Sequence, residues 1–341
     1  MLKKTTDPDI VNSYGLSVLK RQIKSFILIT TILATVVTPL SAEEGGTGHF
    51  MPGSMASFMD GVAADKTFLI RYNLVYYDGG VDPSVSLPIA GTVTLGAEAV
   101  SWANGLTVFW APGKLSERWN YGMSATVPFV SLDVSANVSA DPTSSGNPTT
   151  IKRSDNVNGI GDIVLMPLMF NYHANPDLNF NFRVGIYTPT GSYQAGRLAN
   201  TGKNFWTVEP AAALMYFGTK NGRELSLFAG IDFNTENPDT KYKSGTQFHL
   251  DGTLAQHLPV FSGLGGIGIS GYYYKQISDD SGEGATLGAF RAQDTGLGPV
   301  ISYASKVGGK DLIAETKWLH EFNTKNRLQG DIIWLKVIYK F

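Results

Sequence analysis

The chain has 341 residues, of which 43% are hydrophobic and 16% charged, with a formal net charge of -2 and no cysteine. The lack of cysteine excludes disulfides, thiolate metal sites and a cysteine nucleophile, and the lack of a strongly basic block after the N-terminal region argues against nucleic-acid binding. The charged fraction is below the roughly 25% usual for soluble domains, and the mean hydropathy of -0.04 is too low for a helical membrane protein. This composition suits membrane strands with one apolar and one polar face.

Residues 1–42 have the order of a secretory signal peptide. Basic residues up to Lys24 precede an uncharged apolar run over residues 25–40, and small residues follow up to Ala42. This order predicts export, with cleavage after Ala42. The alternative is a membrane-anchoring helix, which needs roughly 20 apolar residues, whereas this run has 16. The polar residues 1–19 leave open either an extended signal or a later start.

Strand periodicity dominates from residue 67 onward. Near the start of this region, Phe68, Ile70 and Tyr72 share one face, and Arg71 and Asn73 lie on the other. Helical spacing would scatter such apolar residues around a cylinder, so the alternation predicts strands. We predict twelve strands, over residues 67–78, 92–110, 119–136, 160–173, 178–187, 204–217, 223–234, 245–257, 263–276, 288–304, 310–321 and 330–341.

The predicted connections alternate between long and short, which is typical of outer-membrane barrels with long external loops and short periplasmic turns. Trp119, Trp206 and Trp318 flank the apolar faces, as interfacial aromatic residues do. Lipid offers no partner to an open sheet edge, so the sheet must close. We therefore predict an all-β fold, a closed antiparallel transmembrane β-barrel of about 12 strands over residues 67–341. An even strand number places both termini in the periplasm, and a soluble sandwich has no reason to alternate its loops.

The last predicted strand carries a candidate assembly signal. Tyr339 and Phe341 extend an alternating apolar face to the end of the sequence. This ending resembles the signal that the barrel assembly machinery reads. The expected partners are therefore this machinery together with the lipid and lipopolysaccharide of the bacterial outer membrane.

Polar side chains on the lumen side of the predicted strands are candidates for solute selectivity. Charges of both signs in one lumen either pair with one another or set the field of the pore. The lumen candidates are Arg71, Asn73, Arg183, Glu209, Glu224, Asp232, His249, Asp251, Glu315 and Lys317. The aromatic residues Tyr187, Phe228 and Tyr274 either offer a path to aromatic solutes or fill space in a narrow barrel.

The sequence gives no support to catalysis or to a bound cofactor. The histidines lack the serine-rich context of an outer-membrane phospholipase, and they are His49, His173, His249, His257 and His320. His249 and His257 lie eight residues apart on one strand, at roughly 26 Å, too far to share a metal. The glycine-rich stretch 263–268 precedes a strand rather than the helix that a dinucleotide site requires. The acidic residues Asp279, Asp280 and Glu283 lack the spacing of a calcium site, so we expect a solvated loop there, with no enzyme activity, cofactor or metal.

Motifs in order along the chain resemble the family named "putative meta-pathway of phenol degradation", which includes the SphA proteins. The motifs are Gly46-Thr-Gly-His49, Met51-Pro-Gly53, Tyr76-Tyr-Asp78, Gly159-Ile-Gly-Asp162 with Pro167, Thr188-Pro-Thr-Gly-Ser-Tyr193, Asn204-Phe-Trp-Thr-Val-Glu-Pro210, Asn237-Pro-Asp-Thr-Lys-Tyr-Lys-Ser-Gly245, Tyr274-Lys-Gln276, Asp279-Asp-Ser-Gly-Glu-Gly-Ala285 and Gly298-Pro299. The resemblance implies an outer-membrane channel linked to the uptake of aromatic or other hydrophobic compounds.

The family also looks distantly similar to the long-chain fatty acid transporter barrels, which hold an N-terminal segment inside the lumen. This likeness implies a lumen plug over residues 43–66, and the alternative is a flexible periplasmic tail. The plug candidates are His49, Phe50, Met51, Met55 and Phe58.

Taken together, these features predict a channel for passive uptake of small hydrophobic or aromatic compounds across the outer membrane. The solute class rests on the resemblance. One alternative is a general porin for polar solutes, with a wide water-filled lumen. The other is a structural or adhesin barrel without transport, with the loop over residues 137–159 as its contact surface.

Overall fold

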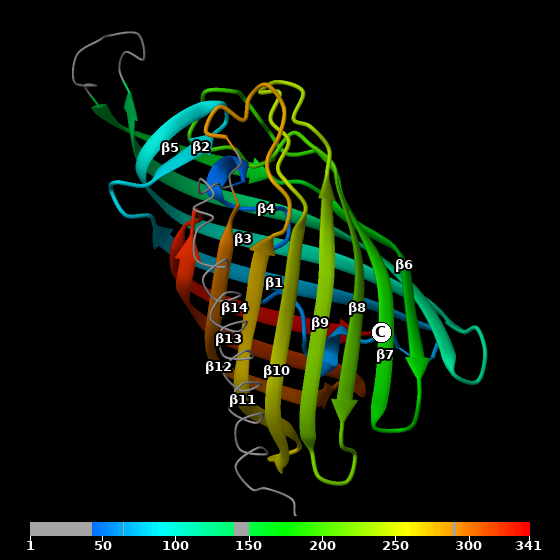
Figure 1. The fold of residues 1–341 in the computed structure, drawn as a ribbon. Coiled ribbons are helices and arrows are strands. Elements are labelled where there is room, and N and C mark those ends of the chain that lie inside the picture. The colour runs from blue at the N-terminus through cyan, green and yellow to red at the C-terminus, as the bar shows by residue number, and fades with distance from the viewer. Residues whose placement is uncertain (1–42, 64, 140–149, 289–290) are drawn as a thin grey trace, which may run out of the picture. The chain divides into compact units, whose positions relative to one another are not determined.

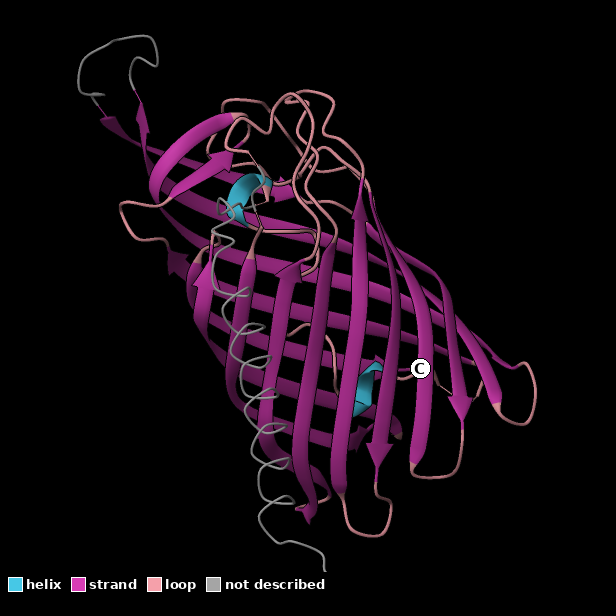
Figure 2. Cartoon of the chain, in the orientation of Figure 1, coloured by secondary structure: helices cyan, strands magenta, loops and turns pink. Residues whose placement is uncertain are grey.

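The computed structural model describes residues 43–341, except for residues 64, 140–149 and 289–290. The predicted signal peptide over residues 1–42 therefore lies outside the described residues. All described residues belong to one compact unit, Leu40–Phe341. This unit is almost entirely β-structure (Figures 1 and 2), with two short 3₁₀ helices, η1 (Glu44–Gly46) and η2 (Phe58–Asp60). Among the described residues, no helix is long and apolar enough to cross a membrane.

A single antiparallel sheet of fourteen strands forms within the described part of the chain, and twelve of its strands close into a barrel. The barrel strands are β1 (Thr67–Gly80), β3 (Thr92–Lys114), β4 (Trp119–Ser139), β6 (Val164–His173), β7 (Leu178–Tyr187), β8 (Thr207–Phe217), β9 (Arg223–Asn234), β10 (Gln247–Val260), β11 (Gly263–Gln276), β12 (Gln293–Val307), β13 (Lys310–Lys325) and β14 (Gln329–Lys340). The closed antiparallel β-barrel predicted from the periodicity is confirmed.

Closure comes from pairing between the first and last strands. β1 pairs with β14 on one side, where Tyr72 lies opposite Val337, and with β3 on the other. From β6 to β14 each strand pairs with its neighbour in sequence, and β3 pairs with β4. This ring leaves no open edge along the wall, as a sheet in lipid requires.

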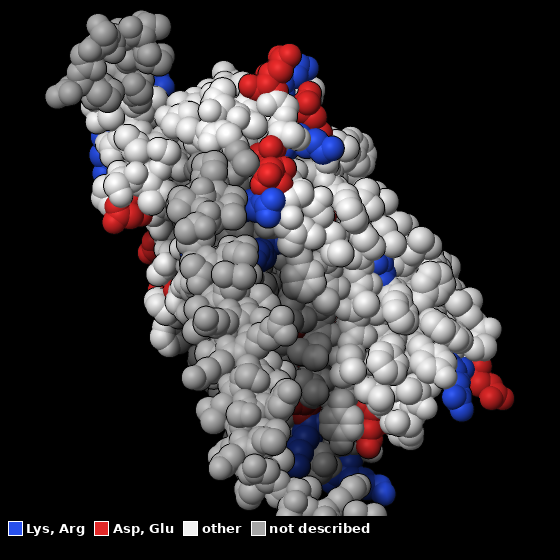
Figure 3. Space-filling view, viewed as in Figure 1, with Lys and Arg blue, Asp and Glu red and all other residues white. Residues whose placement is uncertain are grey.

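Alternation of side chains gives the wall two chemically different faces. In β9, Glu224, Ser226, Phe228 and Asp232 are buried inside, whereas Phe233 is 50% exposed on the outside. On the face seen in Figure 3, charged side chains gather toward the two ends of the barrel, and the wall between them is largely uncharged. An apolar outer band with a polar interior is the arrangement of membrane barrels.

Two strands outside the barrel correct the sequence prediction. Residues 79–91 and 137–159 were predicted to be loops, which was wrong in part. β2 (Ser86–Ile89) pairs with β3. β5 (Thr150–Ile160) pairs with β4. β3 and β4 have 23 and 21 residues, about twice what a membrane-crossing strand needs, so their outer halves offer free pairing edges. β5 is mostly exposed and polar, so it lacks the alternation of apolar and polar residues from which the other strands were predicted. The chain leaves β5 at Gly161 and re-enters the sheet as β6, which starts at Val164 rather than at residue 160.

The lumen is occupied by the chain that precedes β1. Residues 43–63, here called the inner segment, run inside the barrel and carry both 3₁₀ helices (Figures 1 and 2). Phe50, Met55, Met59 and Val62 are buried there. Part of the buried core therefore forms between the inner segment and the inward side chains of the wall.

Candidate functional site in the barrel lumen

The beginning of the inner segment is bound by a buried ion pair and hydrogen bonds. The Glu43 carboxylate pairs with the Arg327 guanidinium and accepts hydrogen bonds from the Tyr274 hydroxyl at 2.7 Å and the Gln247 amide at 2.9 Å. The guanidinium also lies over the Tyr274 ring, 4.3 Å from its centroid. Burial raises the pKa of the neighbouring Glu44 carboxyl above its ordinary value. Tyr274, predicted to be either a path for solute or a space filler, instead binds the inner segment.

The plug candidate His49 contacts two parts of the wall. Its ring nitrogens lie 2.9 Å from an Asp162 oxygen and 2.7 Å from the Thr207 hydroxyl. Burial lowers the pKa of His49 below its ordinary value, and the hydrogen bond and charge of Asp162 oppose this shift. Burial opposes the charged form of Asp162, but hydrogen bonds from His49 and from backbone amides lower its pKa. Phe50 stacks on His249, with ring centroids 3.5 Å apart.

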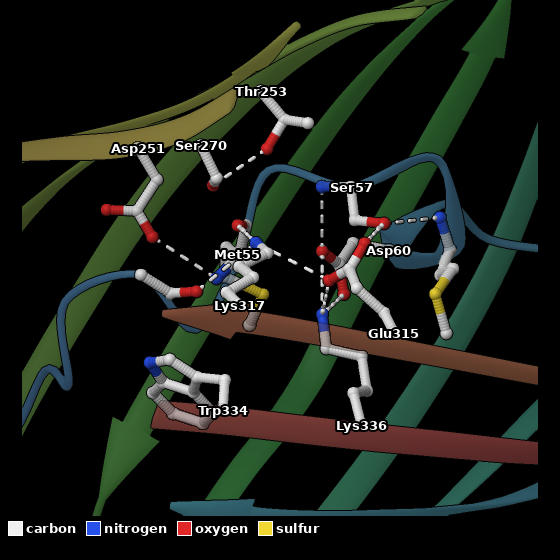
Figure 4. Close-up of polar contacts among 12 residues, drawn as sticks. Met55, Ser57, Asp60, Asp251, Thr253, Ser270, Glu315, Lys317, Trp334 and Lys336 are labelled. Atoms are coloured by element: carbon white, nitrogen blue, oxygen red, sulfur yellow. Dashed lines mark hydrogen bonds and ion pairs between the residues drawn. The ribbon is translucent and has the colours of Figure 1, made fainter. Parts of the chain in front are cut away.

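The middle of the inner segment hydrogen-bonds through its backbone to wall side chains (Figure 4). The Met55 amide donates to Asp251 at 3.2 Å, and the Lys317 ammonium donates to the Met55 carbonyl at 2.9 Å. The Ser57 hydroxyl donates to Glu315 at 2.5 Å. These bonds satisfy backbone groups that an irregular segment would otherwise leave unpaired in the barrel interior.

Asp60, at the end of η2, is surrounded by basic side chains of the wall. Its carboxylate lies 3.2 Å from Arg71 of β1 and 2.9 and 3.1 Å from Lys336 of β14. The Arg183 guanidinium donates to the Asp60 main-chain carbonyl at 2.7 Å. Burial opposes the charged form, but Lys336, Arg71 and Lys317 lower the pKa of Asp60 below its ordinary value.

The ten lumen candidates from the sequence all lie on the inner face of the wall. Eight are buried, and Arg71 and Asn73 are half-buried. Most of the charged candidates bind the inner segment or a neighbouring side chain of the wall. They therefore do not form ion pairs across an open pore. Their role in solute selectivity stays a prediction. The plug candidates Phe50 and Met55 are buried, and His49, Met51 and Phe58 are half-buried.

Glu209, Asp232 and His249 were each predicted as lumen residues, and the structure brings them together in a cluster that the sequence did not predict. The His249 Nε2 atom lies 3.4 Å from Glu209 and 3.7 Å from Asp232, and all three residues are buried. Their ligand atoms lie within 4.8 Å of one another, so among the described residues this cluster has the composition of a divalent-cation site. The residues come from β8, β9 and β10, so only the strand register brings them together.

The predicted solvated loop is also different in the structure. Asp280 is buried, where it accepts hydrogen bonds from the Tyr242 hydroxyl, the Gly245 amide and the Gln276 amide. Burial raises the pKa of Asp280 to about 7. Asp279 remains exposed and pairs with Arg291 at 2.6 Å. A carboxylate used to hold its own loop in this way is not free to bind calcium.

Two cavities lie on either side of the middle of the inner segment. The first has a volume of about 270 Å³ and is mainly apolar. Strands β3 and β4, the β7–β8 loop and the inner segment line it. Its apolar lining includes Ala97, Ala99, Ala103, Val130, Leu132, Val134, Leu198, Phe205 and Met51. The second, of about 310 Å³, lies at the end with the short turns and includes Phe58, Val62, Met215, Phe217 and Ile338. Among the described residues, the two cavities share no lining residue, and Gly53 to Ser57 line neither.

Comparison with known proteins agrees with this architecture. The family model for "Putative MetA-pathway of phenol degradation" matches residues 85–337. No curated protein sequence is similar to the chain. Its structure is similar to the COG4313 outer membrane channel from Pseudomonas putida F1, with a TM-score of 0.60 and 14% identity over 86% of this chain and 100% of that chain. Weaker likenesses are the beta domain of the Bordetella autotransporter BrkA, with a TM-score of 0.46 and 10% identity over 81% and 100% of the two chains, and a mutant of the monoaromatic hydrocarbon channel TodX, with 0.40 and 12% over 89% and 96%.

Proposed function

Because this chain belongs to the family named "Putative MetA-pathway of phenol degradation", we propose that it is an outer-membrane channel through which small hydrophobic or aromatic compounds enter the cell passively. The observation that carries this proposal is the first cavity, an apolar chamber of about 270 Å³ at the end of the barrel with the long loops. A mainly apolar, concave site of this kind suits a small hydrophobic ligand.

The inner segment acts in this proposal as the plug of the channel. Its middle residues lie between the two cavities and are bonded to the wall through Asp251, Glu315 and Lys317. A solute bound in the first cavity therefore reaches the second only after the inner segment shifts. The start of β1 and the end of β14 both lie on the periplasmic side in this proposal, since the barrel has an even number of strands, whereas Glu43 lies beside Arg327 toward the end with the long loops.

The resemblance of the fold to the COG4313 outer membrane channel supports the location in the outer membrane. The apolar outer band is then covered by lipid and, on the outer leaflet, by lipopolysaccharide. In the folded barrel, the exposed ring of Phe341 contacts Phe68 and Tyr339. In this proposal, the barrel assembly machinery binds the same terminal residue before the barrel has folded. The assembly role of Tyr339 and Phe341 is part of the proposal.

Uptake by cells that lack the protein tests this function. Restored cells should take up a labelled monoaromatic compound several-fold faster than cells without the protein. Leu132→Glu, which places a carboxylate in the first cavity, should abolish the gain, because an unpaired charge in an apolar chamber is costly. Leu115→Glu is the matched control, since Leu115 is 59% exposed outside the cavity. Unchanged uptake of aromatics, fatty acids and sphingoid bases would contradict the proposal.

A general polar porin and a structural barrel make different predictions. A porin needs a continuous water-filled lumen, whereas here the inner segment is bonded to both sides of the barrel interior. The structural alternative would use the β4–β5 hairpin, which extends beyond the barrel. Large ohmic conductance in planar bilayers would favour the porin, and no solute uptake at all would favour the structural barrel.

A further inference from the structure

Basic side chains of the wall converge on Asp60 of the inner segment. Four wall cations meet there, on four different strands, and are named here the cationic cluster: Arg71, Arg183, Lys317 and Lys336. Two wall carboxylates, Glu315 and Asp251, are in contact with the same region. Two further wall carboxylates lie near the cluster, since Glu224 accepts a hydrogen bond from the Phe58 amide and Glu209 acts on Arg183. Asp60 supplies the anion that sits closest to Arg71 and Lys336.

The geometry at Asp60 is that of a carboxylate-binding site. One oxygen lies 3.2 Å from Arg71 Nη1 and 2.9 Å from Lys336 Nζ, and the other lies 3.1 Å from Lys336 Nζ. The Ser57 backbone amide donates to the second oxygen at 3.0 Å. Basic side chains that converge on a carboxylate form the strong, charge-assisted class of hydrogen bond.

The carboxylate in this site belongs to the movable part of the channel. Asp60 lies on the inner segment, and its neighbours Phe58, Met59, Gly61 and Val62 line the second cavity. When the inner segment shifts, Arg71 keeps no carboxylate within ion-pair distance among the described residues, and Lys336 keeps only Glu315 at 3.8 Å. Cations left without a partner in a barrel interior are costly, so another anion that reaches them gains binding energy.

We propose that the cationic cluster binds the carboxylate of a transported solute and that Asp60 fills this site while the lumen is closed. This inference rests on the proposed channel function and adds the solute class: aromatic or aliphatic carboxylic acids, with the apolar body in a cavity and the carboxylate on Arg71 and Lys336. The solute displaces Asp60 and so releases the inner segment on its way through.

Equilibrium binding of labelled benzoate to the purified full chain tests the proposal, with benzyl alcohol as a neutral solute of similar size. Asp60→Asn removes the competing charge and keeps the side-chain shape. Because Asp60 competes with the solute for the same charge-assisted hydrogen bonds, benzoate should bind Asp60→Asn about tenfold more tightly than the unchanged protein. Benzyl alcohol should bind both forms equally.

Two further variants separate this site from simple loosening of the inner segment. Adding Arg71→Gln and Lys336→Gln to Asp60→Asn should remove the gain for benzoate. Asp279→Asn, which breaks an exposed ion pair away from the inner segment, is the matched control and should change neither benzoate nor benzyl alcohol binding. Equal gains for both solutes in Asp60→Asn, or a gain that survives the two added glutamines, would overturn the proposal. So would full competition by an equal concentration of chloride at constant ionic strength, because the site would then bind any anion.

A measurement on the otherwise unchanged chain keeps the test decisive if a variant fails to fold. With Ser54→Cys as a thiol reporter on the inner segment, benzoate should increase the rate of thiol modification severalfold and benzyl alcohol should not. No effect of benzoate would count against the proposal. If benzyl alcohol still binds and neutral aromatics still enter cells, the channel function stands and only the carboxylate site fails. If neither solute binds nor enters, the proposed function fails as well.

Discussion

The buried ion pair between Glu43 and Arg327 should hold the inner segment in the lumen. Glu43→Gln removes the charge that faces the buried guanidinium. Removing one partner of a buried pair costs about 3–5 kcal/mol in general. Here the cost should be lower, because Asp294 remains 3.8 Å from Arg327 and the hydrogen bonds from Tyr274 and Gln247 can persist. We expect about 2 kcal/mol, which raises the ratio of displaced to docked inner segment roughly 30-fold.

Thiol accessibility measures this ratio directly. The chain has no cysteine, so Ser54→Cys introduces a single reporter in the middle of the inner segment. When opening and closing are fast, the modification rate by a soluble thiol reagent follows the population of the displaced form. The rate in Glu43→Gln should therefore rise roughly 30-fold over the reporter alone, for the 2 kcal/mol expected above.

The control removes an ion pair that does not touch the inner segment. Asp279→Asn breaks the pair with Arg291, whose side chains are about half exposed, and exposed pairs contribute about 0–1 kcal/mol. Its thiol modification rate should stay unchanged. A rate in Glu43→Gln within about threefold of the reporter alone, with the barrel still folded, would correspond to less than 1 kcal/mol and refute the role given to this pair.

Three further predictions address the inner segment, the buried loop and the first cavity. Gly53→Ala should expose the inner segment to proteolysis, because Gly53 has φ +79° and a Cβ there would lie 2.3 Å from Leu319, whereas Gly196→Ala has a similar φ of +83° with nothing within 4 Å and should not. Because the pKa of Asp280 is raised to about 7, the folded loop holds a proton that the unfolded chain releases near pH 4, so the stability of the loop should fall as the pH rises from about 4 to 7. Hydrogen-exchange protection factors of residues 278–284, which are corrected for the intrinsic pH dependence of exchange, should fall over this range, and Asp280→Asn should remove this fall. Ala99→Phe fills the first cavity and should weaken aromatic binding more than tenfold at a stability cost of about 1–3 kcal/mol, as ligand binding and thermal unfolding will measure.

The barrel could be predicted because membrane strands repeat one simple rule. Alternating side chains gave the bounds of β7, β9 and β11 as the structure has them. The prediction was wrong where this rule does not operate. β5 lies beyond the membrane-crossing part of the wall and is exposed on most of its length, so lipid imposes no apolar face on it. β8 and β12 begin later than predicted, at Thr207 and Gln293.

The lumen was harder to predict because its contacts join residues far apart in sequence. Period two was sufficient to place Arg71, Glu315 and Lys317 on the inner face. Their partners could not be assigned, since Asp60 lies in a stretch with no strand periodicity. Lys336 could have been found, because it alternates with the outward residues Leu335 and Val337 of the last strand. Arg327 sits in the short turn before β14, where sequence patterns carry little information about direction.

The charges of the wall are intelligible only with the inner segment in place. Arg327 pairs with Glu43, and Arg71 and Lys336 pair with Asp60. In an empty lumen Arg71 would have no carboxylate within ion-pair distance among the described residues, and Arg327 and Lys336 would keep only the longer pairs with Asp294 and Glu315, each at 3.8 Å. The wall is therefore complementary to anions that the chain itself supplies. A barrel built only as scaffold would gain more from uncharged packing, because replacing buried ion pairs with well-packed apolar residues is often neutral or stabilising. Retained charge around a removable segment thus favours a channel that opens over a barrel that is permanently sealed.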